Sequence, residues 1–428
     1  MLRLLMISFV ALLSCTGFAR AEVLHFEGNV VREGAVMPIR LHVDTDRNGQ
    51  STLDIPQLWY AEEPINASFD DDGGISLAFP FGLGEFNLVR DGDTWMGVGA
   101  AVIGLQETEA PPYDKVDVSF GSADPNVEGT LYIPEGEGPF PAVILVGGAS
   151  SNQRSQWSYR SRADYYARMG VAALIYDRRD FLTPMPDGAY PDFQTQADDI
   201  IAAGELLAAR DDIDGDAIGL HAGSQGVWLS TMAEGQGGDF AFLIFTGVPA
   251  VTPADSQFQT TIHGMRDDGI AEEEIAQTVA YLRLYFYVAQ TGEGWDALAA
   301  AMATAEGETW FDYVDQPRTI EDLNWWHRVM TYQPREDLVR IATPILAMSG
   351  SADWIAPSEE NLPLIEEYGR VAGNSFVHTM VIEGADHRLE RQPYTDDDGQ
   401  WHWFEVAQEA RDAIPTFLRD DVGLSFGD

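Results

Sequence analysis

Three polar residues, each placed just after an apolar segment, could together carry out nucleophilic chemistry. They are Ser224 in Ala-Gly-Ser-Gln-Gly, Asp353 in Gly-Ser-Ala-Asp and His387 in Gly-Ala-Asp-His. A serine hydroxyl is a poor nucleophile at neutral pH, so an imidazole has to accept its proton while a carboxylate holds the imidazole in the right tautomer. The order Ser, Asp, His therefore indicates attack of Ser224 on an acyl carbonyl, with His387 as the base and Asp353 as its partner.

The segment around Ser224 has the pattern of a strand, one sharp turn and a helix. At such a turn the residues two positions before and after the serine have to be small, because strand and helix pass close together. Ala222 and Gly226 meet this requirement. The turn would aim the Gln225 N–H at a developing oxyanion, and the helix dipole would add to its effect. The pentapeptide alone leaves open a glycine-rich turn with an idle serine.

A second oxyanion donor is expected after the apolar segment 141–146. Gly147-Gly148-Ala149-Ser150 follows that segment at once, and glycines there let a backbone N–H point into a cleft. We expect Ala149 to supply this N–H. A plain tight turn would explain the same residues.

Other histidines and a second aspartate compete for these roles. His378 lies within the final expected strand, His402 lies beyond it, and His221 precedes the serine turn. None of the three follows the end of a strand, so we interpret them as packed or surface residues. Asp386 adjoins His387, but side chains adjacent in sequence point in different directions. Asp353 is therefore the better partner for the imidazole.

From residue 116 onwards strands and helices alternate, which predicts a mostly parallel sheet covered on both faces. Strands are expected before Ser224 and at 127–134, 141–146, 171–176, 240–245, 344–348 and 376–382, and helices at 197–210 and after Ser358. Open sheets present functional groups just past the carboxyl ends of their strands. Asp353 and His387 both stand at such positions.

Between about residues 253 and 340 the pattern is helical throughout, and we expect this insertion to form a cap over the carboxyl ends of the sheet. One of its helices should run from a Thr319 cap through Met330. Most of the cap's aromatic residues should serve packing, while a minority line an acyl pocket. These aromatics include Trp310, Phe311, Trp325 and Trp326.

Residues 22–115 have the short alternating runs and frequent turns of a small all-β domain. Within it, the segment from Asp44 to Gly49 resembles the opening of a calcium loop, with oxygen ligands at Asp44, Asp46 and Asn48. Position twelve of that loop would be Ile55, where a bidentate glutamate is needed. A hairpin turn is therefore the preferred interpretation, and calcium binding stays open.

Residues 1–21 have the pattern of a signal peptide, which predicts a secreted or periplasmic protein. Arg3 precedes the apolar run 4–13, and Ala19-Arg20-Ala21 has the small residues of a cleavage site before Glu22. The run is too short for a stable membrane span. Cys15, the only cysteine of the chain, suggests lipoprotein anchoring as an alternative.

The charge of the chain excludes some partners. There are 25 basic and 69 acidic residues in a sequence of 428, for a net charge of -44. Such a chain would repel nucleic acids and anionic membranes. We interpret the acidic excess as a solvated shell whose self-repulsion is screened by salt.

Residues 116–428 resemble the alpha/beta-hydrolase superfamily in the three motifs that hold Ser224, Asp353 and His387. More narrowly, the chain is similar to secreted esterase and peptidase-like hydrolases with an all-β N-terminal domain. The segments 129–134, 138–143 and 176–179 carry this narrower resemblance. Gly147 stands where many members have histidine, so the oxyanion loop departs from the family pattern. Ala222 stands where most members have glycine, which is a sterically mild change in the serine turn.

The resemblance implies a serine hydrolase that cleaves carboxylic esters of a small-molecule acyl substrate through an acyl-enzyme. It implies neither a metal nor an organic cofactor. The same three residues could serve a peptidase or an amidase. A non-catalytic binding protein with a hydrolase fold is the third alternative.

Overall fold

The computed structural model describes residues 23–45, 50–149, 153–179, 183–186, 188–396 and 398–427. The predicted signal peptide with Cys15, most of the candidate calcium loop (residues 46–49) and Ser150 lie outside this set. Within it, no helix is both long enough and apolar enough to cross a membrane.

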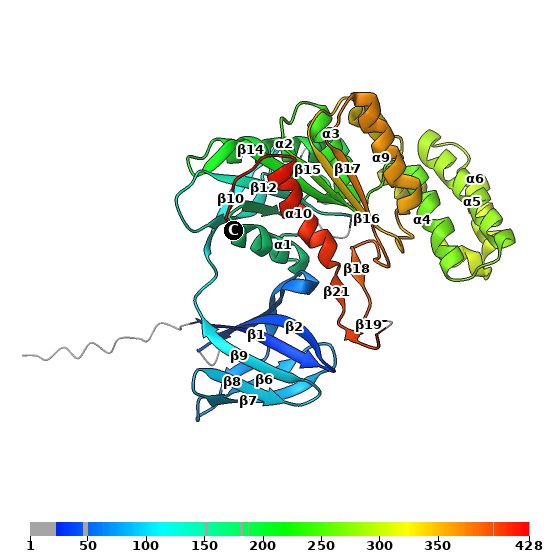
Figure 1. The fold of residues 1–428 in the computed structure, drawn as a ribbon. Coiled ribbons are helices and arrows are strands. Elements are labelled where there is room, and N and C mark those ends of the chain that lie inside the picture. The colour runs from blue at the N-terminus through cyan, green and yellow to red at the C-terminus, as the bar shows by residue number, and fades with distance from the viewer. Residues whose placement is uncertain are drawn as a thin grey trace, which may run out of the picture.

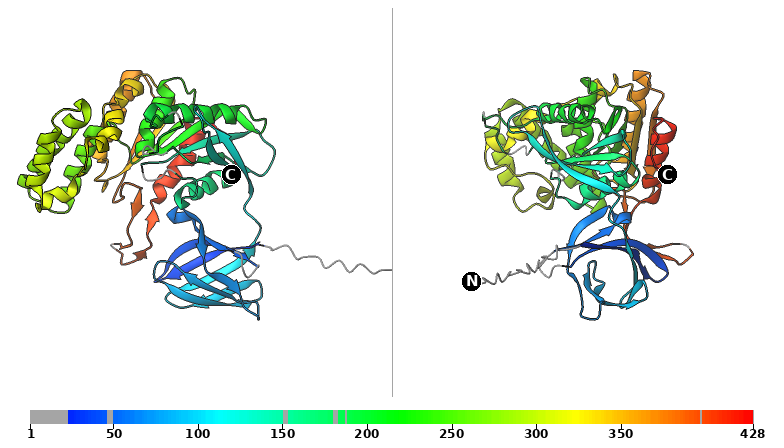
Figure 2. Two further views of the ribbon diagram at one scale, coloured as in Figure 1. Left: turned by 180° about the vertical axis from the view of Figure 1, so that it is seen from behind. Right: turned by 90° about the vertical axis from the view of Figure 1, so that its left-hand side faces the viewer.

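The first part of the chain forms one antiparallel sheet of nine strands (Figure 1). Its order is β4-β3-β2-β1-β9-β8-β7-β6-β5, and it curls around a core of its own (Figure 2). In β2 the side chains of Met37, Ile39 and Leu41 point into this core at every second position, as expected for a strand with one buried face. The strands are β1 (Val23–Arg32), β2 (Ala35–Asp44), β3 (Ser51–Ile55), β4 (Tyr60–Ile65), β5 (Ala67–Phe69), β6 (Ile75–Phe79), β7 (Gly84–Asp91), β8 (Thr94–Val98) and β9 (Val102–Thr108), with a short helix η1 (Pro56–Leu58).

The second sheet has eight strands in the order β10-β11-β13-β12-β14-β15-β16-β17. The strand β11 runs antiparallel to both neighbours, and the other pairs are parallel. The strands are β10 (Tyr113–Phe120), β11 (Val127–Pro134), β12 (Phe140–Val146), β13 (Ala172–Tyr176), β14 (Ile213–Gly223), β15 (Leu243–Thr246), β16 (Ile345–Gly350) and β17 (Val377–Ile382). The predicted mostly parallel sheet is confirmed. The strand expected at 240–245 begins only at Leu243, because Asp239, with φ 52°, turns the chain just before it.

Helices cover both faces of the second sheet (Figure 1). On one face lie α1 (Trp157–Arg168) and α10 (Gln408–Asp420), which share a core with Val143, Leu145 and Ile175. On the other lie α2 (Phe193–Ala208), α3 (Gln225–Gly235) and α9 (Ser358–Ala372). The helix expected from residue 197 starts earlier, because the Asp192 carboxylate accepts the Thr195 N–H at 2.8 Å and caps it.

The insertion between β15 and β16 is helical, as predicted, and projects to one side of the sheet (Figure 1). It contains α4 (Pro253–Asp267), α5 (Glu272–Thr291), α6 (Trp295–Ala305), η2 (Thr309–Tyr313), η3 (Ile320–Leu323), α7 (Asn324–Val329) and α8 (Pro334–Leu338). The helix expected from Thr319 through Met330 begins at the predicted cap, but its first turn is the 3-10 helix η3 and only the part from Asn324 is α-helical. Thr319 and Asp322 form a capping box around the tight turn η3, and a separate short helix follows.

A long excursion near the end of the chain connects the two sheets. Strands β18 (Glu390–Arg391) and β21 (Glu405–Val406) pair with each other, as do β19 (Tyr394–Thr395) and β20 (Trp401–His402). At its far end the indole of Trp403 donates to the carbonyl of Ala35 at 3.1 Å. Figure 1 shows this excursion reaching down to the first sheet.

Buried polar contacts also hold the first sheet against α1. Arg40 of β2 forms an ion pair with Asp164 at 3.0 Å, and Asp164 also accepts the hydroxyl of Tyr113 at 2.9 Å. Arg160 of the same helix pairs with Glu63. Trp59, at the end of η1, packs into the core beneath the second sheet. The two sheets therefore share a buried interface.

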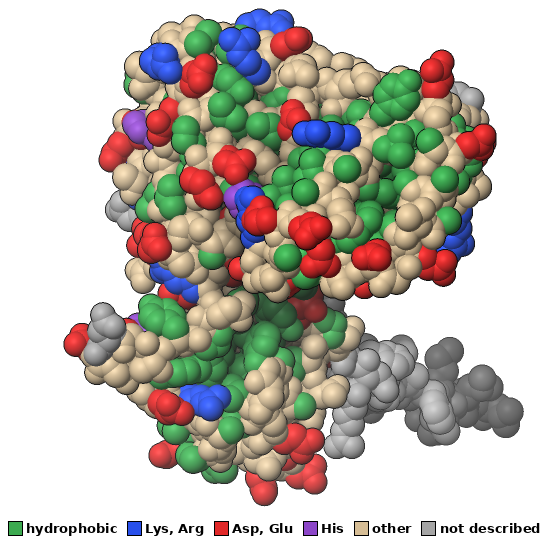
Figure 3. Space-filling view, turned by 90° about the vertical axis from the view of Figure 1, so that its right-hand side faces the viewer, with side chains coloured by type: hydrophobic (Ala, Val, Ile, Leu, Met, Phe, Trp, Pro, Cys, Tyr) green, Lys and Arg blue, Asp and Glu red, His purple; other side chains and the backbone are tan. Residues whose placement is uncertain are grey.

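The surface carries the acidic excess that the composition indicates. Figure 3 shows Asp and Glu side chains spread widely over the face drawn, with Lys and Arg in fewer places. Exposed carboxylates of this kind repel one another in low salt.

Candidate active site

Ser224 lies at the apex of the turn between β14 and α3, half-buried and in a strained conformation. Its φ of 52° and ψ of -126° fall in a region that residues with a Cβ rarely adopt. The strain is held in place because the Ser224 N–H donates to the Thr246 carbonyl of β15 at 3.0 Å. The turn therefore presents the hydroxyl at the carboxyl edge of the sheet.

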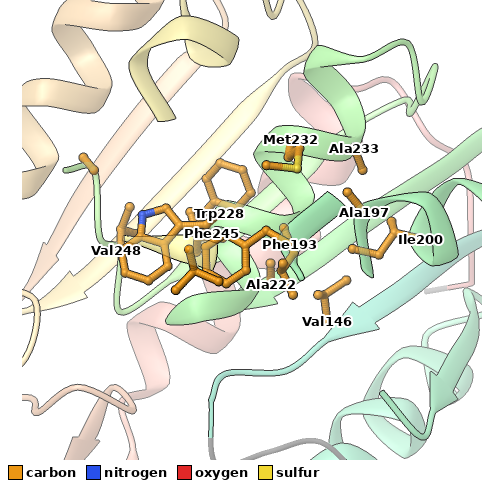
Figure 4. Packing of buried hydrophobic residues seen from close by; sticks show 14 of the residues in the cluster. Val146, Phe193, Ala197, Ile200, Ala222, Trp228, Met232, Ala233, Phe245 and Val248 are labelled. Carbon is orange, nitrogen blue, oxygen red and sulfur yellow. The ribbon is translucent and has the colours of Figure 1, made fainter. Parts of the chain in front are cut away.

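Small residues are needed on both sides of this turn, as the sequence predicted. A Cβ on Gly226 would lie 2.4 Å from the carbonyl oxygen of Val146, a distance that real atoms do not reach. Ala222 is fully buried and pairs with Val146 in the sheet. Figure 4 shows Ala222 among Val146, Phe193 and Phe245, where a larger side chain would have no room.

Asp353 and His387 are joined directly. Asp353 follows β16, His387 follows β17, and the His387 Nδ1 lies 2.8 Å from Asp353 Oδ2. The other oxygen, Oδ1, accepts the N–H groups of Ile355 and Ala356 at 2.9 Å each. Asp353 is buried, with 4% of its surface exposed, and these three hydrogen bonds fix the orientation of its carboxylate. This arrangement leaves the His387 Nε2 free to exchange a proton elsewhere.

Ser224 and His387 line one cavity of about 810 Å³. In the described part of the chain no hydrogen bond joins the Ser224 hydroxyl to the imidazole. Hydrogen bonds of this kind are often long in a free enzyme and shorten when substrate binds. The structure thus brings His387 to Asp353, and places Ser224 on the wall of the same cavity.

The two expected oxyanion donors also line this cavity. Gln225 is the first residue of α3, and the N–H of that position has no acceptor within the helix. Ala149 lies in the loop after β12, on the same cavity wall. A Cβ on Gly148 would lie only 3.0 Å from the Cβ of Ser224, so glycine lets this loop come close to the serine.

Arg178 organises the loop and was not assigned a role from the sequence. Its guanidinium donates to the carbonyls of Gly147 at 3.2 Å and Gly148 at 2.9 Å. Because a trans peptide places its N–H opposite its carbonyl, the Ala149 N–H points away from Arg178. A basic residue shortly after a buried strand, in the segment 176–179, is the only sequence signal for this function.

The competing residues are engaged elsewhere. His221 is 3% exposed and its Nδ1 lies 3.0 Å from the Tyr166 hydroxyl. His378 pairs with Asp421 at 3.0 Å, and His402 with Asp396 at 2.9 Å. Asp386 does not contact the imidazole; it accepts the N–H groups of Arg388 and Glu390 at 2.9 and 3.0 Å.

The cap supplies one wall of the cavity. Trp325, Trp326 and Tyr285 line it. Trp310 and Phe311 instead pack against Tyr281, with ring centroids 5.9 and 5.8 Å away. Aromatic residues of the cap therefore divide between packing and the cavity.

Comparison with known proteins finds a short local similarity. No family model matches the chain. It is 44% identical over 52 residues to Esterase FrsA of Enterobacter sp. (strain 638), and 39% identical over 51 residues to Esterase FrsA of Escherichia coli strain K12 / DH10B. Each match spans only 12% of this chain and 12% of the relative's length.

Solved structures give distant overall similarities. An esterase of Pyrobaculum calidifontis has a TM-score of 0.43 at 14% identity, over 72% of this chain and 83% of its own. Esterase 2 of Thermogutta terrifontis, phosphonylated by sarin, has a TM-score of 0.44 at 15% identity, over 74% and 98% of the two chains. The mostly parallel eight-stranded sheet, the helical insertion and the serine turn together form a fold of the alpha/beta-hydrolase type, preceded by an antiparallel β-sheet.

Proposed function

We propose that this chain is a serine hydrolase that cleaves carboxylic esters. The observation that carries the proposal is the 2.8 Å bond between His387 and Asp353 beside the cavity that holds the strained Ser224. We further propose that residues 22–115 form a separate β domain and residues 116–428 the catalytic domain, with residues 253–340 as its cap. Export through a signal peptide at residues 1–21 belongs to the same proposal.

In the first step the Ser224 Oγ forms a bond to the acyl carbonyl carbon, and its proton passes to His387 Nε2. The electron pair of the carbonyl moves onto oxygen, where the N–H groups of Gln225 and Ala149 stabilise the negative charge. His387 then donates its proton to the leaving alcohol as the carbon–oxygen bond to that alcohol breaks. An acyl-enzyme on Ser224 remains.

In the second step water attacks the acyl-enzyme. His387 accepts the proton of water, and the tetrahedral intermediate collapses to release the acid and restore the Ser224 hydroxyl. Asp353 keeps the imidazole in the tautomer whose Nε2 accepts a proton, and stabilises the imidazolium in between.

Two observations favour esters as the substrate class. The described cavity is lined on the cap side by Trp325, Trp326 and Tyr285, which suits an apolar acyl chain. The chain is also similar over 52 residues to Esterase FrsA, a protein that is named as an esterase, and this supports the same substrate class.

The test is labelling of the purified chain with a fluorophosphonate, combined with turnover of para-nitrophenyl butyrate. We expect both signals to be lost in Ser224→Ala. Ser230→Ala is the matched control: Ser230 lies six residues after Ser224 in α3, fully buried, and its hydroxyl has no partner among the described residues. Labelling that persists in Ser224→Ala, or equal loss in both variants, would contradict the proposal.

A further inference from the structure

A second cavity meets the first at Ser224. Ser224 and His387 also line a cavity of about 730 Å³ on the side of α1 and the first sheet. Its walls come from distant parts of the chain: Trp59 follows η1, Arg162 lies on α1, and His221 lies on β14. The cavity therefore connects the first sheet to the candidate nucleophile.

Trp59 is held in this cavity wall at a conformational cost. It is 2% exposed and has a φ of 46°, in the left-handed region that favours glycine. Its indole ring lies under the guanidinium of Arg162, 4.4 Å from the ring centroid, a cation–π arrangement. The indole Nε1 is buried and has no acceptor among the described residues. Burying a donor without a partner costs about 1–3 kcal/mol, so an acceptor that reached this N–H would recover that cost.

Arg162 differs from its neighbours on α1. Arg160 pairs with Glu63, and Arg168 pairs with Asp164 at 2.7 Å. Arg162 forms no ion pair in the described part of the chain, although the charge of Glu390 acts on it across the same cavity. Its Nε, like that of Arg160, is buried without a partner among the described residues. The sequence has 69 acidic residues and 25 basic ones, so most guanidinium groups would be expected to form an ion pair, and Arg162 does not form one among the described residues. This leaves a cation on the wall of the cavity.

His221 adds a third polar atom from a third element. Its Nε2 is buried and has no partner among the described residues, while its Nδ1 faces the hydroxyl of Tyr166. Burial, and next to it the charge of Arg162, lower the pKa of His221 well below its usual value. The ring is therefore neutral, and it contributes polarity without a second positive charge.

We propose that this second cavity binds a carboxylate that is part of the substrate, through the guanidinium of Arg162 and the indole N–H of Trp59. The substrate class is then an ester that carries a free carboxylate on the portion held between the first sheet and α1. This inference rests on the proposed ester hydrolysis for its substrate, but the binding site is defined by Arg162 and Trp59 alone.

The surroundings of Arg162 select a single negative charge. Glu390 and Asp386 line the same cavity, together with Arg388. Burial, and then the charge of Asp386, raise the pKa of Glu390 to about 7, so near neutral pH Asp386 is the main fixed negative charge beside Arg162. A dianionic phosphate would face this repulsion twice, so a monoanionic carboxylate is the better ligand.

Direct binding tests the site without any need for turnover. In the Ser224→Ala protein, calorimetry with monomethyl glutarate and with dimethyl glutarate compares an anion with its neutral match. We expect the anion to bind at least about tenfold tighter, which a single charge-assisted hydrogen bond can supply. Arg162→Gln should remove this difference and Arg162→Lys should restore part of it. Arg160→Gln should keep it, because Arg160 lies two residues earlier on the same helix, on a different face, where it pairs with Glu63 of the first sheet.

Three results would overturn the inference: equal binding of the two glutarates, an unchanged preference in Arg162→Gln, or inorganic phosphate binding more tightly than monomethyl glutarate. The comparison with Arg162→Lys guards against a variant that merely unfolds. A preference lost equally in Arg160→Gln would mean that loosening of the interface, not Arg162, is responsible.

Kinetics then separate this inference from the proposed function. The ratio of kcat/KM for para-acetoxybenzoate to that for its methyl ester, corrected for spontaneous hydrolysis, should fall about tenfold in Arg162→Gln and stay unchanged in Arg160→Gln. If neutral and anionic esters are both cleaved and the ratio does not respond to Arg162, the inference is wrong while the hydrolase proposal stands. If no ester is cleaved but monomethyl glutarate binding depends on Arg162, the hydrolase proposal fails and the anion site stands.

Discussion

The Nδ1 of His387 lies 2.8 Å from the Oδ2 of Asp353, and the other oxygen of that carboxylate is held by two backbone N–H groups. The imidazole orientation therefore depends on one aspartate. Asp353→Asn would present an amide N–H₂ group to Nδ1 and favour the wrong tautomer. We expect kcat to fall by about 10⁴ with the fold intact.

The measurement is kcat on para-nitrophenyl butyrate together with the circular dichroism spectrum. Asp386→Asn serves as the control, because Asp386 binds only backbone N–H groups and an asparagine oxygen can still accept them. A fall in kcat in Asp386→Asn as large as that in Asp353→Asn would contradict the assignment of Asp353 as the partner of His387.

Gly226→Ala should disrupt the serine turn. The added Cβ would lie 2.4 Å from the Val146 carbonyl, so the start of α3 has to move. Overpacking of this kind costs about 1–3 kcal/mol, and it should abolish most activity because Ser224 moves with the helix. Thermal melting and labelling by fluorophosphonate measure the two effects.

A glycine in β14, the strand that precedes the turn, provides the comparison. At Gly215 an added Cβ would have its nearest neighbour at 3.6 Å, an ordinary contact. Gly215→Ala should therefore keep both stability and labelling. If the two alanine variants behaved alike, close packing at the turn would not be the cause.

Arg178→Gln should slow catalysis by about 10- to 100-fold, chiefly in kcat. The loss follows because the loop carbonyls of Gly147 and Gly148 lose their donor, and a displaced oxyanion donor weakens stabilisation of the transition state. A positioning role predicts an unchanged pH dependence of kcat, since His387 and Asp353 are untouched. A fall in substrate affinity alone, with kcat preserved, would contradict this role.

The carboxyl group of Glu390 should make stability depend on pH. Burial, with a smaller contribution from Asp386, raises its pKa to about 7. A raised pKa in the folded state means that the neutral form is favoured by folding, so its stabilising contribution is present in acid and is lost as the pH rises through about 7. Glu390→Gln mimics the neutral form at every pH.

Melting temperatures of the parent and Glu390→Gln, measured at about pH 5 and about pH 8, test this sign. We expect similar values in acid and a more stable variant in base, by on the order of 1 kcal/mol. A difference that is the same at both pH values would show that the glutamine acts through packing and not through ionisation.

Added salt should stabilise the folded chain. A net charge of -44 causes self-repulsion that counterions screen within about 10 Å at 0.1 M salt. The melting temperature should rise as NaCl increases from about 0.1 to about 1 M. A flat or falling curve would argue that the acidic shell carries no such cost.

Much of the candidate site could be predicted because its geometry is local. Ser224 is defined by the small residues around it, and Asp353 and His387 by their position after strands, since parallel strands end at one edge of a sheet. The choice of Asp353 over Asp386 followed from a different local rule, that side chains adjacent in sequence point in different directions. These signals need only a few neighbouring residues each.

Other features depend on contacts between distant segments. Trp59 lies in a region of β pattern, and nothing near it in sequence indicates that its ring reaches the wall of a cavity shared with Ser224. The helix α1 escaped prediction because its buried face consists largely of tyrosine, alanine and the ion-paired Asp164, which do not form an obvious apolar stripe.

The excursion that starts at Glu390 connects the first sheet to the segment that carries His387, the proposed catalytic base. Only three positions after His387, the chain leaves along β18, and its far end is fastened to Ala35 by Trp403 and to Gln57 through the Phe404 carbonyl. A movement of the first sheet relative to the second would therefore also displace the segment that carries the His387 imidazole. Removal of the N-terminal strands would therefore leave the segment around His387 less firmly held and would remove one wall of the second cavity.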